Sequence, residues 1–422
     1  MNSSDRADLT TTHRSAIDPG LVKQLEDLIG TASVLSDPAD RWAYGVDNSR
    51  RQTMPGAVAL PADEAAIVDI VGFCRSNGIA ATVRGRGTGT TGAAVPSDDG
   101  LVISTERMNR ILSIDEDNRV AVVQTGVTNE AVQNAAAEKG FFWPPDPTSA
   151  AYCSIGGNLA CNAAGPRAVK YGTPRENTLG LRAVAGNGDV LRTGCYTTKG
   201  VVGYDLTRLL IGSEGTLAII TEATLKLTPL PAARATMRAV YRDMASAALA
   251  VSAIMAQPLV PRVLEFMDGN SIRMISDYAA GDLPVDAGAM LIIEADGDPS
   301  TLSVATRALE AAATNAGLIE YRSATSAEEV QSLWACRKAL SPALRSVAPG
   351  KINEDVVVPV SEMARLIQSL DELAREFDIT IVNFGHAGNG NIHVNLLGDT
   401  TDPEIAARMR GCLARVFQSV LD

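Results

Sequence analysis

The sequence has 422 residues, a hydrophobic fraction of 46% and a net charge of −12, from 37 basic and 49 acidic residues. A chain of this length exceeds one ordinary hydrophobic core, so we expect at least two domains. The acidic balance excludes a basic face for nucleic acid or anionic lipid and favours small-molecule chemistry. There is no apolar run of about 18 residues and no secretory leader, which predicts a cytoplasmic protein.

The first half of the chain alternates short β-rich runs with amphipathic runs. A strand at 57–60, a helix at 64–76 and a strand at 80–83 form the first such unit. Glycine-dense loops separate further expected strands at 101–103, 119–124, 181–185 and 217–221. The prolines at 229 and 231 indicate a linker.

A second alternation of strands and helices begins after this linker. Strands are expected at 237–241, 262–266, 290–294, 353–358, 379–384 and 392–396, and helices at 245–255, 271–277, 300–316, 327–340, 362–377 and 403–421. The sequence therefore predicts an α+β protein with a helical segment at 1–55, one domain at 56–230 and another at 231–422. This order suits antiparallel sheets covered by helices on one face.

A glycine-rich loop, Arg84-Gly85-Arg86-Gly87-Thr88-Gly89-Thr90, follows the expected strand at 80–83. Such glycine density lets successive backbone amides converge on an anion, and the threonine hydroxyls add donors. The loop lacks the Gly-Lys-Ser/Thr ending of a Walker loop and runs into Pro96 rather than into a long helix. A purely structural turn is the alternative interpretation.

A second glycine loop follows the proline-rich stretch that contains Pro145. Ser154 is placed to cap a short helix whose first turn contains Gly156 and Gly157, which predicts exposed amides for a second phosphate. Two such loops favour a dinucleotide ligand. A third glycine-containing stretch, Gly212–Thr221, includes Glu214, which is either a ligand contact or an ordinary surface carboxylate.

His386 and His393 are two of only three histidines in the chain. They bracket the stretch 387–392, in which Gly388 and Gly390 are expected to form the turn of a hairpin. Positions that face each other across antiparallel strands lie about 5 Å apart at Cβ, close enough for both imidazoles to reach one divalent ion. A metal or catalytic site is the favoured interpretation, and two loop histidines without such a role are the alternative.

With these loops in this order, the chain resembles the FAD-linked oxidases of the vanillyl-alcohol oxidase type. Within that family it is most similar to the D-lactate and D-2-hydroxyglutarate dehydrogenase group, which includes the flavin subunit of glycolate oxidase. The resemblance implies a two-domain flavoprotein, with a PCMH-type FAD-binding domain and an antiparallel-sheet cap domain. The matching segments cover most of the chain beyond residue 55 and include 84–96, 144–165, 170–172, 199–227, 353–359 and 385–395.

The resemblance also implies which residues bind FAD. They are Arg84, Gly85, Arg86, Gly87, Thr88, Gly89, Thr90, Pro145, Ser154, Gly156, Gly157, Asn158, Glu214, Ile219 or its neighbour Ile220, and Asn391. Many relatives have a histidine in the first loop that bonds covalently to the flavin, and the corresponding position here is Thr88. We therefore expect non-covalent FAD.

Further roles follow from the resemblance in the second domain. His386 and His393 are implied ligands of a divalent ion, zinc or manganese, with His393 and Asn395 also among the catalytic residues. Arg337 and Lys351 resemble the residues that bind the carboxylate of a 2-hydroxy acid, and the fork of Arg337 suits a bidentate contact. An exposed surface charge is the alternative for each of these two cations.

The match breaks at the end of the chain. Relatives continue into an E-H-G-I-G segment that supplies a third metal ligand and a general base, whereas this sequence ends at Asp422 and contains no Glu-His pair. We expect a fragment rather than a variant with an incomplete site.

The resemblance implies oxidation of a D-lactate-like D-2-hydroxy acid to the 2-oxo acid, with electrons passing to a quinone, a cytochrome or an electron-transfer flavoprotein. A homodimer, an iron–sulfur partner subunit and a peripheral membrane location are compatible expectations. One alternative is a flavin-binding subunit or truncated homologue without independent catalysis. Another is a flavin enzyme of different chemistry, such as an NADPH-dependent sugar-nucleotide reductase, which has no use for the histidine pair.

Overall fold

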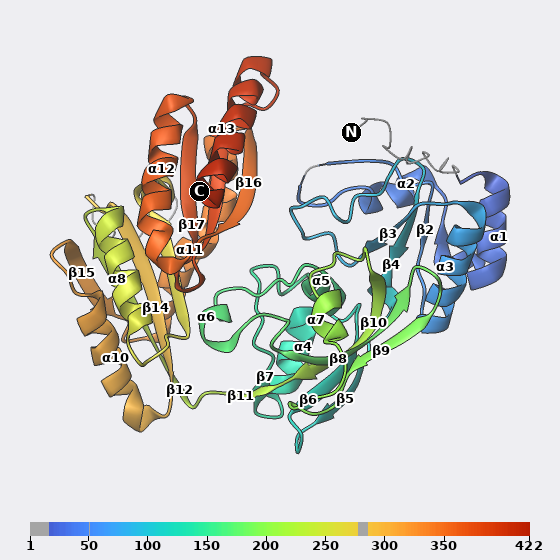
Figure 1. The fold of residues 1–422 in the computed structure, drawn as a ribbon, viewed down its shortest axis with the longest axis horizontal. Helices are drawn as coiled ribbons and strands as arrows, with labels where there is room; N and C mark the ends of the chain where they lie inside the picture. Colours follow the sequence, from blue (N-terminus) through green and yellow to red (C-terminus); the bar gives the residue numbers. More distant parts are fainter. Residues whose placement is uncertain (1–16, 50, 277–285) are drawn as a thin grey trace, which may run out of the picture. The chain divides into compact units, whose positions relative to one another are not determined.

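The structure is a computed structural model that describes residues 17–49, 51–276 and 286–422 (Figure 1). The chain folds into two compact units. The first comprises the chain up to Ala164 together with Thr173–Pro229, and the second comprises Gly165–Gly172 and Leu230–Asp422. The short segment Gly165–Gly172 therefore belongs to the second unit, although the first unit surrounds it in sequence.

The first unit begins with a four-stranded sheet of order β1-β2-β4-β3, in which β4 pairs in parallel with both β2 and β3. Helix α3 (Glu64–Asn77) begins at Asp63, whose carboxylate accepts a hydrogen bond from the Ala66 amide, and ends at Gly78 in the left-handed conformation. Its buried residues pack with α1 against the sheet. The other elements here are α1 (Pro19–Ile29), β1 (Val34–Leu35), α2 (Pro38–Arg41), β2 (Ala57–Ala59), β3 (Ala81–Arg84) and β4 (Leu101–Ser104).

A five-stranded antiparallel sheet of order β5-β6-β10-β8-β9 completes the first unit. Alternate residues along its central strands point into one core, where they pack around the fully buried side chain of Trp143. The remaining elements are β5 (Ile111–Asp115), β6 (Val120–Gln124), α4 (Asn129–Ala137), β7 (Phe141–Phe142), α5 (Ile155–Ala160), β8 (Thr178–Ala185), β9 (Val190–Gly194), α7 (Leu206–Leu210), β10 (Ala218–Lys226) and β11 (Thr228–Pro229).

The second unit is built on a seven-stranded antiparallel sheet of order β15-β12-β14-β13-β17-β18-β16. Its strands are β12 (Ala233–Tyr241), β13 (Val263–Asp268), β14 (Ala289–Gly297), β15 (Leu318–Ser323), β16 (Gly350–Val357), β17 (Thr380–His386) and β18 (Asn391–Gly398). Its helices are α6 (Ala168–Tyr171), α8 (Met244–Ala256), α9 (Gly269–Ser276), α10 (Pro299–Ala313), α11 (Ala327–Val347), α12 (Met363–Glu376) and α13 (Pro403–Leu421). The expected end of α9 at Asp277 lies outside the described residues.

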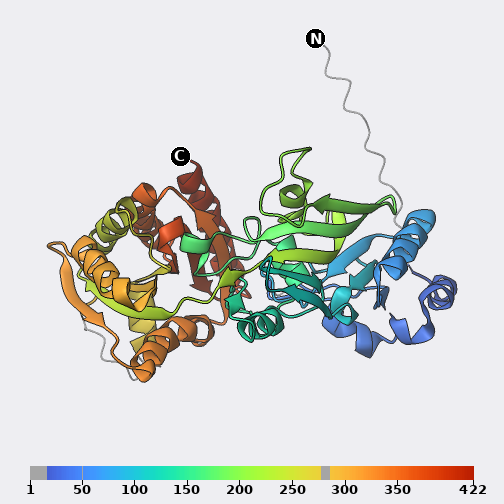
Figure 2. The same cartoon turned by 90° about the horizontal axis from the view of Figure 1, so that it is seen from below.

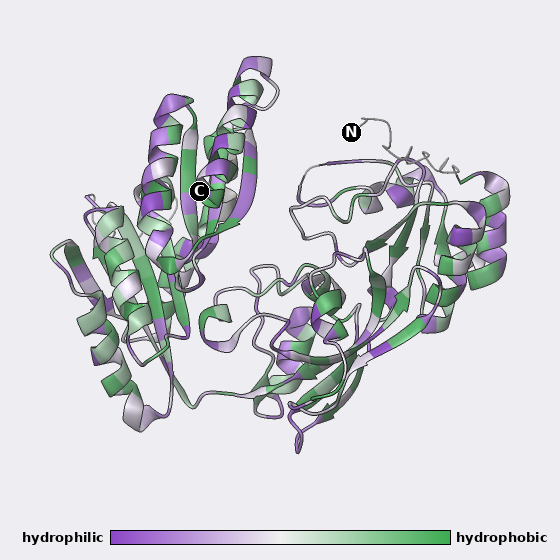
Figure 3. Cartoon of the chain, in the orientation of Figure 1, coloured by the Kyte–Doolittle hydropathy of each residue, from purple (hydrophilic) through white to green (hydrophobic). Residues whose placement is uncertain are grey.

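Alternation along these strands gives the sheet two different faces. One face carries Leu264, Phe266 and Leu291 and packs beneath α8, α10, α12 and α13, which form the expected helical layer. On the other face, α9 and α11 cover Met267, Met290 and neighbouring apolar residues, so helices lie on both sides of this sheet (Figure 2). In Figure 3 the middle strands of this sheet are mostly hydrophobic, whereas α12 carries many hydrophilic residues and α8 few.

No helix in the described part of the chain has both the length and the apolar character needed to cross a bilayer.

Candidate functional site

The first candidate site is a cleft of about 730 Å³ in the first unit. The loop that follows β3 forms one wall, with Gly85, Arg86, Gly87, Thr88 and Gly89 among its lining residues. Ser154, Gly157, Asn158 and Glu214 also line the cleft, so the structure brings together most of the residues expected to bind FAD.

Hydrogen bonds from Asn48 hold the loop after β3 in place. The backbone amide and the side chain of Asn48 donate hydrogen bonds to the carbonyls of Gly89 and Thr88, at 2.9 and 3.1 Å. Among the described residues, the amides of Gly87, Thr88 and Gly89 donate no hydrogen bond. Three neighbouring unbonded amides in a cleft are a suitable arrangement for an anion such as a pyrophosphate.

The second glycine loop contributes differently from expectation. The three amides at the start of α5 are already used: Ile155 donates to the Val127 carbonyl, Gly156 to the Thr125 carbonyl and Gly157 to the Ser154 hydroxyl. The prediction of exposed amides at this helix start is therefore wrong. Ser154 does cap α5, and the loop lies so close to the first one that a Cβ on Gly85 would be 2.5 Å from the Ser154 hydroxyl oxygen. These glycines provide space rather than hydrogen-bond donors.

Some of the residues expected to bind FAD also make structural contacts within the first unit. The guanidinium of Arg84 is buried and donates to the carbonyls of Val46 and Ala43, at 2.8 and 3.1 Å. The Pro145 carbonyl accepts a hydrogen bond from Asn129, which also donates to the Asn158 side chain. These contacts hold the cleft walls in place.

Strand β10 presents Ile220 rather than Ile219 to the glycine loops. Ile220 lines a second cleft of about 410 Å³ together with Gly85, Gly156 and Glu214. Ile219 points to the opposite side of the strand and packs with Ile103 and neighbouring core residues. Of the two neighbours named from the sequence, Ile220 is thus the lining residue. Thr90 is absent from the lining of both clefts.

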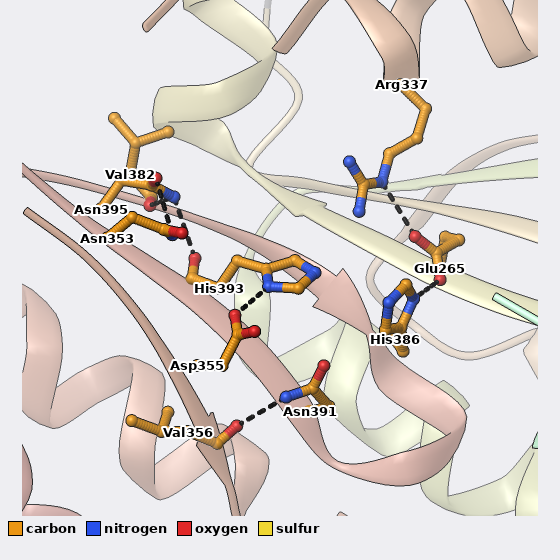
Figure 4. Close-up of polar contacts among 10 residues, drawn as sticks. All are labelled: Glu265, Arg337, Asn353, Asp355, Val356, Val382, His386, Asn391, His393 and Asn395. Atoms are coloured by element: carbon orange, nitrogen blue, oxygen red, sulfur yellow. Dashed lines mark hydrogen bonds and ion pairs between the residues drawn. The ribbon is translucent and has the colours of Figure 1, made fainter. Parts of the chain in front are cut away.

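The second candidate site lies on the face of the seven-stranded sheet that carries α9 and α11 (Figure 4). The imidazoles of His386 and His393 lie with their ring centroids 5.1 Å apart. In the strand register His393 faces Phe384 and His386 faces Asn391, so the two histidines are diagonal neighbours rather than direct partners. The turn between them is a short 3-10 segment at Ala387–Asn389, closed by Gly390 at φ 67°.

A carboxylate holds each imidazole through its Nδ1 atom. Glu265 on β13 bonds to His386, and Asp355 on β16 bonds to His393 (Figure 4). Each carboxylate is the direct cross-strand partner of its histidine. Neither Nε2 atom has a hydrogen-bond partner among the described residues. This arrangement fixes the ring orientation and leaves both Nε2 lone pairs for another ligand.

Glu265 also contacts Arg337, the predicted carboxylate-binding residue on α11. The Arg337 Nε donates to the second carboxylate oxygen of Glu265 at 2.9 Å, and its guanidinium lies 4.7 Å from the centre of the Phe384 ring. Burial alone would raise the pKa of Glu265, but the interaction with His386 and the positive charge of Arg337 outweigh this effect and hold the pKa at about 2. Glu265 is therefore an ionised carboxylate at neutral pH.

Asn395 and Lys351, predicted as catalytic, and Asn391, predicted to bind FAD, lie on the paired strands β18 and β16. Lys351 is four residues before Asp355 and so lies toward the other end of these strands from the histidine turn. Asn395 is fully buried, donates to the carbonyls of Val382 and His393, and accepts from Asn353, so its amide supports the strand that carries His393. Lys351 lies in β16 opposite Leu397. Asn391 donates to the Val356 carbonyl at 3.2 Å, which joins β18 to β16.

Within the described residues, no group of three or more His, Cys, Asp or Glu side chains is arranged to bind a metal ion. His386 and His393 are the two available donors, since Glu265 and Asp355 are bonded to the far side of each ring. The arrangement fits two ligand positions of a divalent ion, with the outer-sphere carboxylates typical of metal-bound histidine.

Sequence analysis did not find Glu265 or Asp355. A signal for Glu265 was present: it is the single charge inside the otherwise apolar run Val263–Met267. A lone carboxylate in a strand with both neighbours buried requires a partner, and here it has two.

The fold and these two clusters define a two-domain flavoprotein, with an FAD-binding unit and an antiparallel-sheet second unit. Residues 55–194 match the family model of the FAD binding domain, and residues 230–422 match that of the C-terminal domain of FAD linked oxidases. The chain belongs to the FAD-linked oxidases, as its resemblance to that family indicated.

Several relatives are similar over nearly the whole chain. The glycolate oxidase subunit GlcD of Bacillus subtilis is 38% identical over 401 residues, which cover 95% of this chain and 85% of that protein. A D-2-hydroxyglutarate dehydrogenase of Xanthomonas citri is 33% identical over 400 residues, 90% of this chain and 81% of that protein. A D-lactate dehydrogenase of Archaeoglobus fulgidus is 34% identical over 365 residues, 84% and 79% respectively.

Solved structures share the fold at lower identity. An alkyldihydroxyacetonephosphate synthase is similar with a TM-score of 0.77 and 17% identity, covering 96% of this chain and 81% of that one. A p-cresol methylhydroxylase is similar with a TM-score of 0.76 and 18% identity, covering 95% and 86%.

Proposed function

We propose that the protein oxidises a small D-2-hydroxy acid, of the size of D-lactate or glycolate, to the corresponding 2-oxo acid. In this reaction the substrate loses its hydroxyl proton and the hydride on C2. FAD, when bound non-covalently in the first unit, would supply the hydride acceptor at its N5 atom, and the two electrons would leave to an acceptor other than NAD. The relatives named for glycolate, D-lactate and D-2-hydroxyglutarate support this substrate class without selecting one member.

The observation that carries the proposal is the cluster of Arg337, His386 and His393 on one face of one sheet. Arg337 uses Nε for Glu265, and its two Nη atoms have no hydrogen bond or ion pair with a described residue. A guanidinium in this state can bind the carboxylate of a hydroxy acid through two parallel hydrogen bonds. Phe384, stacked on the guanidinium, restricts its movement.

His386 and His393 are the residues that would hold a divalent ion, zinc or manganese, through their Nε2 atoms. When bound, such an ion supplies Lewis-acid chemistry that lowers the pKa of a substrate hydroxyl. The chain contributes the ring orientation, because Glu265 and Asp355 keep each Nδ1 atom engaged. Asn395 contributes the position of the His393 backbone.

The electron acceptor is proposed to be a quinone, a cytochrome or an electron-transfer flavoprotein. Two of the relatives are named as subunits of glycolate oxidase, which supports a partner subunit, such as an iron–sulfur protein, or a homodimer.

Anaerobic reduction of the flavin tests the proposal. D-lactate, glycolate and D-2-hydroxyglutarate are each added to purified yellow protein, with L-lactate as the stereochemical control, and loss of the flavin absorbance is followed. We expect bleaching by at least one D-2-hydroxy acid or glycolate, and loss of this bleaching after treatment with EDTA or in the His386→Ala variant. Bleaching that is unaffected by both treatments would remove the metal from the proposal. No bleaching by any of these acids would overturn the proposed reaction.

The names of these relatives also favour one alternative, a flavin-binding subunit without turnover of its own. That function predicts normal FAD binding, no reduction by any hydroxy acid in the purified chain, and reduction once a partner subunit is added.

A further inference from the structure

Glu265 combines three properties that are costly together. Its side chain is completely buried, it carries a charge, and each of its two oxygens contacts a different cationic or titratable side chain. Oε2 accepts from Arg337 on α11, and Oε1 bonds to His386 on β17. No other described residue bonds to both of these side chains.

Stability alone does not account for this arrangement. Removing a carboxylate from water costs several kcal/mol, and well-packed apolar residues in place of a buried ion pair are often equally or more stable. The surroundings of Glu265 are suited to an apolar residue, since Met267 and Ile292, on the same face of the sheet, are buried in an apolar core.

We infer that Glu265 is a positioning residue that fixes the His386 imidazole and the Arg337 guanidinium relative to each other. This inference rests on the proposed function, in which His386 holds the metal ion and Arg337 binds the substrate carboxylate. Glu265 thereby sets the separation between the two groups that receive the two ends of one hydroxy acid. A misplacement of about 1 Å in such a pair is enough to slow a reaction strongly.

The role needs two acceptor oxygens, and a glutamine provides only one. In Glu265→Gln, if the NH₂ of the glutamine side chain faces Arg337, two donors meet and that hydrogen bond is lost. An amide group that faces His386 instead donates to Nδ1 and forces the ring proton onto Nε2, the atom needed for the metal. Either orientation therefore loses one of the two contacts.

Two other carboxylates serve as matched controls. Asp355 bonds to His393, and an asparagine there can turn its remaining oxygen toward the ring, so Asp355→Asn keeps an acceptor. Glu294 is buried on the same face of the next strand and also uses both oxygens, for Trp334 and Thr236 on one side and Arg262 on the other. Glu294→Gln thus removes an equivalent buried charge without touching either histidine or Arg337.

The experiment measures two quantities for each FAD-loaded variant. The affinity for Zn²⁺ is obtained by titration against a competing chelator, without substrate, and kcat and KM for the most active hydroxy acid are obtained at saturating metal. Thermal unfolding of each variant shows that it is folded. For Glu265→Gln we expect Zn²⁺ binding to weaken by roughly 10- to 100-fold and KM at saturating metal to rise by about tenfold. Glu294→Gln should match the wild type in both, and Asp355→Asn, which keeps an acceptor for His393, should weaken Zn²⁺ binding less than Glu265→Gln does.

The inference is overturned if Glu265→Gln and Glu294→Gln lose the same stability and are otherwise alike, because Glu265 is then only a support of the sheet. A change in Zn²⁺ affinity with an unaltered KM would also contradict it, since no link to Arg337 would remain. If the wild-type protein oxidises no hydroxy acid, the proposed function fails, and the Zn²⁺ titration of the same variants still decides whether Glu265 positions His386.

Discussion

Two buried carboxylates on β13, Glu265 and Asp268, have pKa values displaced in opposite directions. Glu265 has a pKa of about 2, because its contacts with His386 and with the Arg337 guanidinium overcome the effect of burial. Burial of Asp268 raises its pKa to about 6, although the amides of Ser271 and Asn383 donate hydrogen bonds to it. The difference lies in the type of partner: neutral amides stabilise a buried charge less than a guanidinium does.

Asp268 gives a prediction for the pH dependence of stability. A pKa that rises from 3.8 to about 6 on folding means that the folded state binds more protons than the unfolded state between these values. The favourable contribution of protonated Asp268 to the free energy of unfolding is therefore fully present below pH 4 and is lost as the pH rises to 6. The loss is about 3 kcal/mol by the usual conversion.

The measurement compares urea unfolding of the wild type with that of Asp268→Asn, whose side chain does not titrate. Between pH 4 and pH 6 the unfolding free energy of the wild type should fall relative to that of Asp268→Asn. Above pH 6 the difference between the two proteins should stay constant. A difference that does not vary with pH would mean that Asp268 keeps an ordinary pKa in the folded protein.

Thr88 leads to a prediction about the cofactor. It lines the cleft proposed to bind FAD, the family resemblance implies that many relatives have a flavin-bonded histidine at this position, and a threonine hydroxyl forms no such bond. Acid precipitation should therefore release all the FAD into the supernatant, where its absorbance is measured. Flavin fluorescence that remains on the protein band of a denaturing gel would contradict this, and Cys153→Ser would then test the one cysteine that lines the same cleft and is buried.

At the scale of elements, the histidine hairpin depends on the conformation of one residue. Gly390 has a φ of 67°, and a Cβ at this position would overlap the Val358 carbonyl oxygen. Gly390→Ala should therefore cost about 1 kcal/mol for the left-handed backbone and a further 1–3 kcal/mol for the overlap. Because the turn spaces the two histidines, Zn²⁺ affinity should fall as well.

Gly140→Ala is the control for this variant. Gly140 also has a positive φ, of 77°, but a Cβ there meets no atom within 4 Å. Thermal unfolding should show the larger loss for Gly390→Ala. Equal losses would indicate that the Val358 carbonyl moves aside at little cost.

The sequence predicts elements best where local signals agree. Helix α13 has the predicted bounds 403–421, because Asp402 caps its start and an apolar stripe repeats along it. The histidine hairpin was also predicted, but not the diagonal offset of its two rings, since the 3-10 turn shifts the register and a glycine-rich pattern does not specify the turn type. Likewise, the side of β10 that lines the cleft could not be chosen, because Ile219 and Ile220 are both apolar.

At the scale of the whole molecule, contacts between residues remote in sequence decide to which unit a segment belongs. Tyr171 and Lys170 on α6 bind the buried carboxylate of Asp296 on β14, with the Tyr171 hydroxyl at 2.7 Å, and Arg262 lies 3.3 Å from it. These contacts join Gly165–Gly172 to the second unit. No local pattern predicts such an assignment, because it depends on a partner about 125 residues away in the sequence. The pairing of Glu265 with His386 and Arg337 was beyond prediction for the same reason.

Tyr171→Phe tests this assignment. Loss of the hydroxyl leaves one hydrogen bond to a buried carboxylate unmade, at a cost of about 1–3 kcal/mol. The variant should lower the unfolding temperature of the second unit, followed by far-UV circular dichroism, and leave the temperature of FAD release from the first unit unchanged. Tyr152→Phe, at a residue 73% exposed, should change neither. A drop in the temperature of FAD release alone would contradict the assignment.

The membership of Gly165–Gly172 in the second unit has a consequence for protein engineering. The polypeptide passes from one unit to the other three times, after residues 164, 172 and 229. A chimera joined only at Pro229 would therefore combine residues 230–422 of a donor with the eight-residue segment Gly165–Gly172 of the recipient. Exchange of substrate specificity between family members should require both pieces to be transplanted together.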